Sequence, residues 1–400
     1  MSNFLKKCGK IILCILLVLI LIPTAVIGFV WHNEIAGVMS FKEIRARDDA
    51  HKDGAVYELT VGGGYYLEDF IEQGGVSSDE ELIDFVVDHI TKGMIPVDIK
   101  KPHVGCSSFT ATAENGDYIF ARNYDMRKTN TCIVRTLARK GRHATISTAD
   151  LGMVGMNANQ NVEGLIKKIT CLAAVYVPLD GMNDAGVSCG VYMTHQGPGN
   201  KDEATNQQTD RPDMTTTTFI RMVLDYADSL EDAVEIAQNY DMHDSAGSSY
   251  HYMVADSTGR SAIFEWIAGT DVTDQDGTQR ELVITYNDDD ENIGEQEGAN
   301  DFQCVTNFII QPNYYEKQES MRGLDRYNYL YEQLALSNGI VKDSTDAMHY
   351  LQSVGRRHWN NDGGNGITVH SIVCNMTQKT IIWIPNEQYD DPSAWFTFKF

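Results

Sequence analysis

The chain has 400 residues, of which 42% are hydrophobic and 22% are charged. This composition is typical of a globular protein rather than a disordered or fibrous one. Lys and Arg number 32 against 56 Asp and Glu, which gives a net charge of −24. Proteins that bind nucleic acids neutralise phosphates with a basic surface, and no basic cluster occurs after the first ten residues. We therefore expect no nucleic-acid partner.

The N-terminus resembles a membrane anchor. Three lysines within residues 6–10 precede an almost unbroken apolar run from Ile11 to Val30, which is long enough to span a bilayer as a helix. A signal sequence would need a small-residue cleavage site, and the candidates here fit poorly. We expect residues 1–30 to form a single-pass anchor in the cell membrane. The basic flank should stay cytoplasmic, which would leave the rest of the chain outside the cell; secretion is the alternative.

Residues 31–105 form a first segment with one clear helix. Ser78 and Glu81 make a capping box before an apolar stripe, and Lys92-Gly93 ends the helix. Two prolines in the stretch that follows, up to Val104, indicate an extended connector.

Beyond residue 105 the pattern alternates short strands with pairs of helices. Hairpin turns are expected at Asn115-Gly116, Ser257–Gly259 and Met376–Lys379, and helices at 216–227, 230–239, 324–337 and 345–354. Hairpins joined through helix pairs predict an α+β domain, in which helices cover antiparallel sheets.

Eight cysteines are present, two of them in the anchor region. The other six are Cys106, Cys132, Cys171, Cys189, Cys304 and Cys374. Their spacing fits neither a disulfide framework nor a zinc site, so we expect no metal or other cofactor, and any disulfide pairing stays open.

Cys106 stands at the start of a strand-like run that turns back at Asn115-Gly116. A two-residue turn at this position would place Cys106 directly opposite Asp125. Strict alternation would then direct Arg122 to the other face, so that a bend or bulge would be needed to bring it to the same site. The hairpin therefore predicts a thiol beside a carboxylate, with an arginine nearby.

This combination suits a nucleophile. A thiol attacks only as a thiolate, which needs a neighbouring cation or base. If the bond before Cys106 were cut, the new α-amino group, with a pKa near 8, could be that base. Asp125 could hold the ammonium form and Arg122 could stabilise the thiolate. From these residues alone, a buried structural cysteine is the competing interpretation.

Several motifs resemble the choloylglycine hydrolase family. These are N-terminal-nucleophile amidases that include conjugated bile acid hydrolases, penicillin V acylases and, more distantly, acid ceramidase. The matching runs are C-S-S-F-T from Cys106, A-R-N-Y-D ending at Asp125, D-G-M-N-D-A-G-V from Asp180, V-T-N ending at Asn307, and D-R-Y around Arg326. They follow one another in the family's order, and the resemblance extends to about residue 384.

The resemblance implies a four-layer αββα catalytic domain over residues 106–400, and it implies roles for single residues. Cys106 would be the nucleophile and Arg326 would add positive charge beside it. Asn307 would donate to the oxyanion of the tetrahedral intermediate, and Met193 would contribute only a backbone N–H, because its side chain cannot donate. Bile acid hydrolases have asparagine and penicillin acylases tyrosine at that position.

The resemblance also implies an activity. We expect an outward-facing amidase of linear C–N bonds in small N-acyl compounds, activated by self-cleavage between Gly105 and Cys106, with residues 31–105 as a prosegment. Glycine offers the least obstruction at the attacked carbonyl. An acyltransferase that uses the same acyl-cysteine, and a non-catalytic envelope binding protein, are the alternatives. Relatives often form homo-oligomers, so assembly is possible here too.

Overall fold

The computed structural model describes residue 10 and residues 28–93, 105–195, 203–268, 276–288, 302–312, 314–315, 321–359 and 366–400. The predicted anchor lies largely outside these residues, as does the connector before Gly105. Within the described part of the chain, no helix combines the length and the apolar character needed to cross a bilayer.

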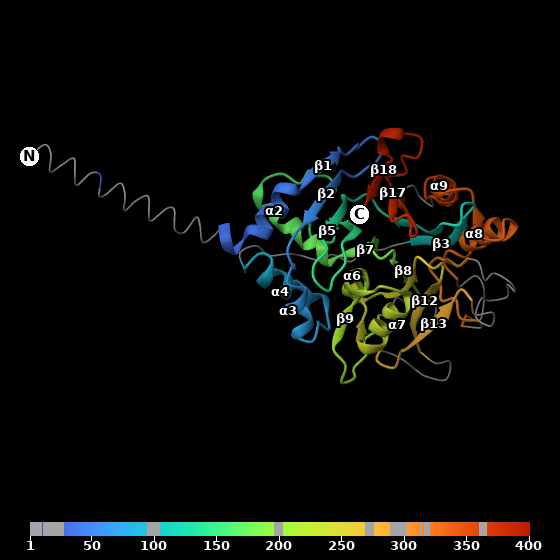
Figure 1. The fold of residues 1–400 in the computed structure, drawn as a ribbon, viewed down its shortest axis with the longest axis horizontal. Coiled ribbons are helices and arrows are strands. Elements are labelled where there is room, and N and C mark those ends of the chain that lie inside the picture. The colour runs from blue at the N-terminus through green and yellow to red at the C-terminus, as the bar shows by residue number, and fades with distance from the viewer. Residues whose placement is uncertain are drawn as a thin grey trace, which may run out of the picture.

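Two large β-sheets form the centre of the molecule (Figure 1). The larger sheet has nine strands in the order β1 (Lys42–Arg45), β2 (Val56–Val61), β5 (Thr131–Thr136), β6 (Thr145–Asp150), β7 (Pro178–Asn183), β8 (Ser188–Thr194), β11 (Ser249–Ala255), β12 (Ser261–Ile267) and β13 (Glu281–Tyr286). Its neighbours pair antiparallel except β2 and β5, which are parallel, so the sheet is mixed.

The smaller sheet carries Cys106. Its order is β14 (Cys304–Val305), β3 (Gly105–Ala113), β4 (Tyr118–Met126), β16 (Ile367–Asn375), β17 (Thr380–Pro385) and β18 (Phe396–Lys399), and β15 (Ile340–Val341) also pairs with β3. A separate two-stranded sheet consists of β9 (Asp213–Thr215) and β10 (Asp241–His243).

Helices cover the outer faces of both sheets. On the larger sheet, α6 (Thr216–Tyr226) contacts β7 and β8, and α7 (Leu230–Asn239) contacts β11. On the smaller sheet, α8 (Leu324–Leu336) and α9 (Ser344–Ser353) contact β3. The inner faces meet where β3 contacts β8. The predicted α+β class with four αββα layers is therefore what the chain adopts, and the four predicted helices and three predicted hairpins after residue 105 are confirmed.

The segment before Gly105 is built into this fold. It contains α2 (His32–Ser40), α3 (Leu67–Glu72) and α4 (Asp79–His89), and it supplies β1 and β2 to the larger sheet. Leu59, Leu67 and Phe70 are fully buried in the main apolar core. The predicted boundary between residues 105 and 106 thus falls inside one continuous packed structure. One more helix, α5 (Leu165–Cys171), packs against α2.

The predicted capping box of α4 is present in altered form. The Ser78 hydroxyl accepts from the N–H of Glu81 at 3.2 Å, as expected for an N-cap. The Glu81 carboxylate, however, accepts from the N–H of Ser77 rather than from that of Ser78.

Candidate active site

The register of the hairpin that bears Cys106 differs by one residue from the prediction. Cys106 lies opposite Tyr124, and it is Gly105 that lies opposite Asp125. The turn is a loop of three residues, closed by hydrogen bonds from Ala113 N–H to the Asp117 carbonyl at 2.7 Å and from Gly116 N–H to the Ala113 carbonyl at 2.8 Å. Gly116 takes the left-handed conformation that this loop requires, with φ at +87°.

This shift of one residue changes which side chains of the hairpin lie on the same face as Cys106. Arg122 lies opposite Ser108, so simple alternation places its side chain on the same face as Cys106 and no bulge is needed. The predicted bend at this position was wrong, because the extra loop residue changes which residues share a face. The side chain of Asp125 instead belongs to the other face.

Arg122 connects the two sheets beside Cys106. Its side chain is fully buried, and its Nη2 donates to the Cys106 Sγ at 3.5 Å and to the Val191 carbonyl of β8 at 2.6 Å. Gly190 makes room for it, since a Cβ there would lie 2.8 Å from the Arg122 Cδ. Among the described residues, Arg122 is the only one that donates a hydrogen bond to this sulfur.

Asp180, on β7, holds the other end of the guanidinium. It forms a buried ion pair with Arg122, accepts from the Thr148 hydroxyl at 2.6 Å and lies 2.8 Å from His370 Nε2. Burial alone would raise the pKa of Asp180, but His370 and Arg122 outweigh it and lower that pKa to about 2. The carboxylate is therefore charged at neutral pH and fixes the position of Arg122.

Sequence reasoning did not find the roles of Asp180 and His370. Asp180 was noticed only as the first residue of a motif that makes a turn, and that turn is present, with Asn183 accepting from the N–H groups of Ala185 and Val187. Nothing in the sequence around His370 singles it out, because it comes from β16, on the other sheet.

Asn307 reaches Cys106 from the other edge of β3. Val305 pairs with Ser108, so two further residues along the chain bring Asn307 opposite Cys106. Its Oδ1 accepts from the Cys106 N–H at 3.0 Å, and its Nδ2 donates to the Met193 carbonyl at 2.9 Å. Asn307 therefore lies beside Cys106, and Met193 lies beside Asn307, to which it presents its carbonyl; the predicted role of the Met193 N–H stays a prediction.

Arg326, near the start of α8, joins these groups together. Its Nη1 donates to the Cys106 carbonyl at 2.8 Å and to Asp125 Oδ2 at 3.0 Å, and its Nη2 donates to Asn307 Oδ1 at 2.8 Å. Thr368 donates to the second oxygen of Asp125 at 2.7 Å. Burial raises the pKa of Asp125, and Arg326 opposes this rise. The structure thus brings together all the residues singled out in the sequence.

The Cys106 thiol is buried and protonated in this structure. The Cys106 side chain is 0% exposed. Burial raises the pKa of its thiol to about 11, although the charge of Arg122 opposes the rise. The six described cysteines are all free and buried. Within the described ranges, no group of three or more His, Cys, Asp or Glu side chains could hold a metal.

Residues 178–389 match the sequence model of the family described as acyl-coenzyme A:6-aminopenicillanic acid acyl-transferase, which is just over half of the chain. The chain belongs to this family. The match confirms the predicted relationship to N-terminal-nucleophile enzymes of amide C–N bonds. In this family member the matched part contains Asp180, Asn307 and Arg326, whereas the hairpin with Cys106 precedes it. No curated protein is similar enough in sequence to match the chain.

Several solved structures resemble this family member. Penicillin V acylase from Agrobacterium tumefaciens is 16% identical, with a TM-score of 0.43, and the match covers 70% of this chain and 83% of that one. A mutant conjugated bile acid hydrolase from Clostridium perfringens is 13% identical, with a TM-score of 0.44 and coverages of 74% and 97%. An N-acylethanolamine-hydrolyzing acid amidase ortholog from Caenorhabditis elegans is 17% identical, with a TM-score of 0.39 and coverages of 74% and 100%. Such low similarity does not transfer an activity.

Proposed function

We propose that this chain is the precursor of an N-terminal-nucleophile amidase, which hydrolyses linear amides of small N-acyl compounds. One observation carries the proposal: separate groups bind the nitrogen, the carbonyl oxygen and the sulfur of Cys106. Asn307 binds the Cys106 nitrogen, Arg326 its carbonyl oxygen and Arg122 its sulfur. A structural cysteine at a strand start has no need of such contacts, because its sulfur usually behaves as a small apolar group.

The first step is self-cleavage. The Cys106 sulfur attacks the Gly105 carbonyl carbon and gives up its proton, the C–N bond breaks, and the nitrogen takes that proton to become a primary amine. The resulting thioester is hydrolysed by water, which leaves a carboxylate on Gly105 and a free thiol and α-amine on Cys106. The full burial and raised thiol pKa of the uncut form fit an inactive precursor.

The second step is substrate turnover. An unperturbed α-amine has a pKa of about 7.7–8.0, so it can take the thiol proton near neutral pH, and the thiolate then attacks the substrate carbonyl. Arg122 stabilises the thiolate, and the Asn307 amide donates to the oxyanion, a contact worth about 3 kcal/mol in well-studied cases. The leaving amine takes the proton back, and water releases the acid from the acyl-cysteine.

We further propose that residues 31–105 stay bound after the cut. The strand β2 lies between β1 and β5, and its Val56, Tyr57 and Leu59 are buried. Separation would expose the edge of β5 and the core beneath it, which is costly because unpaired strand edges and apolar surface both favour association. The N-terminal fragment would thus remain a noncovalent subunit of the enzyme.

The apolar run from Ile11 to Val30 is the basis of a proposal about the location of the enzyme. We propose that it tethers the enzyme to the cell membrane with the catalytic domain outside, or directs it to secretion. Protease treatment of intact cells tests the topology: the catalytic fragment should be digested without lysis, and full protection would contradict an outward orientation. Assembly into homo-oligomers stays a prediction.

The molecular mass of the purified protein tests the chemistry. We expect a fragment that begins at Cys106, and we expect Cys106→Ala to stay uncut and inactive. Cys132→Ala is the matched control, since Cys132 is also a free, fully buried strand cysteine, and it should be cut normally. Two fragments from Cys106→Ala, or activity in a chain that retains the Gly105–Cys106 bond, would contradict the proposal.

The substrate class is open to a direct screen. N-acyl amino acids, bile acid conjugates, penicillin V and N-acylethanolamines differ in acyl group and amine, and release of the free amine reports hydrolysis. The description of the matched family favours a second candidate, an acyltransferase. In that case an added amine would capture the acyl group and give a new amide, whereas a hydrolase gives the free acid.

A further inference from the structure

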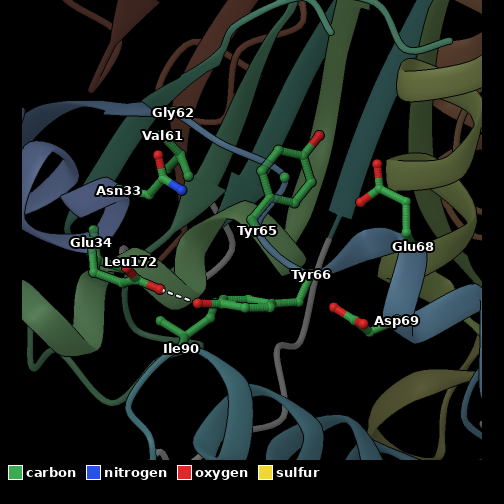
Figure 2. A pocket seen from close by; sticks show the side chains of 11 residues that line it. Asn33, Glu34, Val61, Gly62, Tyr65, Tyr66, Glu68, Asp69, Ile90 and Leu172 are labelled. Atoms are coloured by element: carbon green, nitrogen blue, oxygen red, sulfur yellow. Dashed lines mark hydrogen bonds between the residues drawn. The ribbon is translucent and has the colours of Figure 1, made fainter. Parts of the chain in front are cut away.

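A cavity of about 160 Å³ is lined mainly by residues that precede Cys106 in the chain, and it shares no lining residue with the candidate active site. Its apolar wall includes Val61, Ile90 and Leu172. Figure 2 shows Glu34 meeting the Tyr66 hydroxyl on one side of this cavity, with Glu68 and Asp69 on the other side. The cavity has room for several water molecules or one small organic molecule, since a water takes about 30 Å³.

Glu34, on α2, is the feature that points to a ligand. Its side chain is only 9% exposed. Its Oε1 accepts from the Tyr66 hydroxyl at 2.5 Å, but its Oε2 has no hydrogen-bond partner in the described part of the chain. A carboxylate oxygen buried without a donor is costly, and native structures usually satisfy such atoms. Glu34 Oε2 therefore needs a hydrogen-bond donor, which a bound molecule would supply.

The described cations of this region bind atoms other than Glu34 Oε2. Lys92 donates to the Tyr66 hydroxyl at 2.7 Å and lies over the tyrosine ring, and Arg142 pairs with Glu68 at 3.3 Å. The described charged residues that line the cavity are all acidic. Asp69 is exposed, so its negative charge faces the solvent and attracts cations toward the buried carboxylate.

The backbone that forms this cavity is strained. Tyr65 and Tyr66 both have positive φ angles, of +35° and +61°, directly after three glycines. Such conformations in bulky residues cost of order 1–3 kcal/mol each and cluster at ligand clamps and active sites. Both strained residues line the cavity, and Tyr66 supplies the hydroxyl that donates to Glu34.

We propose that the cavity binds a small primary ammonium ion with a short carbon chain. The ammonium group donates to Glu34 Oε2, and the carbon chain contacts the apolar wall. A metal ion fits less well, because the carboxylates are spread around the cavity and the described residues contain no cluster of three metal-ligating side chains. This site does not depend on the proposed amidase activity.

Calorimetric titration of the detergent-purified full-length protein tests the proposal. The probes are n-propylammonium, tetramethylammonium, which has the charge but no N–H donor, and n-propanol, which has a hydroxyl donor but no charge. We expect saturable binding of n-propylammonium alone. Absence of that binding, or equal binding of tetramethylammonium, would overturn the proposal without any variant.

Two matched variants locate the binding site. Glu34→Gln keeps the size and the acceptor for Tyr66 but removes the charge, and we expect it to weaken n-propylammonium binding at least about tenfold. Glu72→Gln changes an exposed carboxylate on the neighbouring helix α3 and should leave the affinity within about twofold. Equal affinity of Glu34→Gln and wild type would place the ligand elsewhere and refute the assignment.

Discussion

The carboxylate of Asp180 should be the main counter-ion of the arginine beside the nucleophile. Replacement by asparagine keeps the shape of the side chain but leaves the Arg122 guanidinium buried without its ion pair. The lowering of the Asp180 pKa from 3.8 to about 2 corresponds to roughly 2 kcal/mol in favour of the folded, charged form. Breaking a buried pair typically costs about 3–5 kcal/mol.

We therefore expect Asp180→Asn to lower the free energy of unfolding by about 2–5 kcal/mol. The melting temperature should fall by roughly 2–6 °C, which thermal unfolding can measure. Both proteins should carry Cys106→Ala, so that the comparison is made between uncut chains. In chains that keep Cys106, the variant should also be cut more slowly, because Arg122 is no longer fixed against the sulfur.

The pH dependence provides an independent check. The folded pKa of Asp180 is lowered, so its stabilising effect is complete above about pH 4 and is lost as the pH falls toward 2. The stability difference between wild type and variant should thus shrink as the pH falls below about 4. Asp150→Asn is the matched control: burial raises the pKa of Asp150, so removal of its charge should cost less. Equal stability of Asp180→Asn and wild type at pH 7 would refute the reasoning.

Three further substitutions probe the packing around Cys106 and in the N-terminal segment. Gly190→Ala places a methyl group 2.8 Å from the Arg122 Cδ, so it should cost about 1–3 kcal/mol in thermal unfolding and slow self-cleavage; normal cutting would show that the arginine tolerates displacement. Gly105→Ala should fold and be cut at the same bond, because the nearest atoms to the new Cβ are at 3.7 Å; a chain that stays uncut would mean that glycine is chemically required. Leu59→Ala should cost about 2–5 kcal/mol and weaken retention of the N-terminal fragment in gel filtration, whereas unchanged co-elution would mean that β2 does not hold it.

Local signals in the sequence were enough to predict four helices after residue 105, although not α5, and the three hairpins. They also made Cys106 a candidate nucleophile, which the family resemblance then favoured. These features depend on short-range patterns: 3.6-residue apolar spacing, turn residues and a cysteine followed at fixed intervals by arginine and aspartate. Even here one local detail was decisive. The choice between a two-residue and a three-residue loop at Asn115-Gly116 changes which side chains share a face, and the sequence alone is compatible with either loop.

Long-range contacts were decided only by the tertiary structure. Asp180 and His370 meet because β7 and β16 belong to opposite sheets that pack face to face, and no local pattern encodes that meeting. Likewise, the sequence indicates only that residues 31–105 form a prosegment, whereas in the structure they supply β1 and β2 to the larger sheet. The parallel pairing of β2 with β5 joins strands that are far apart in the chain, so no local pattern predicts it. Periodicity identifies the face that each element buries, whereas the partner of that face depends on the packing of the whole chain.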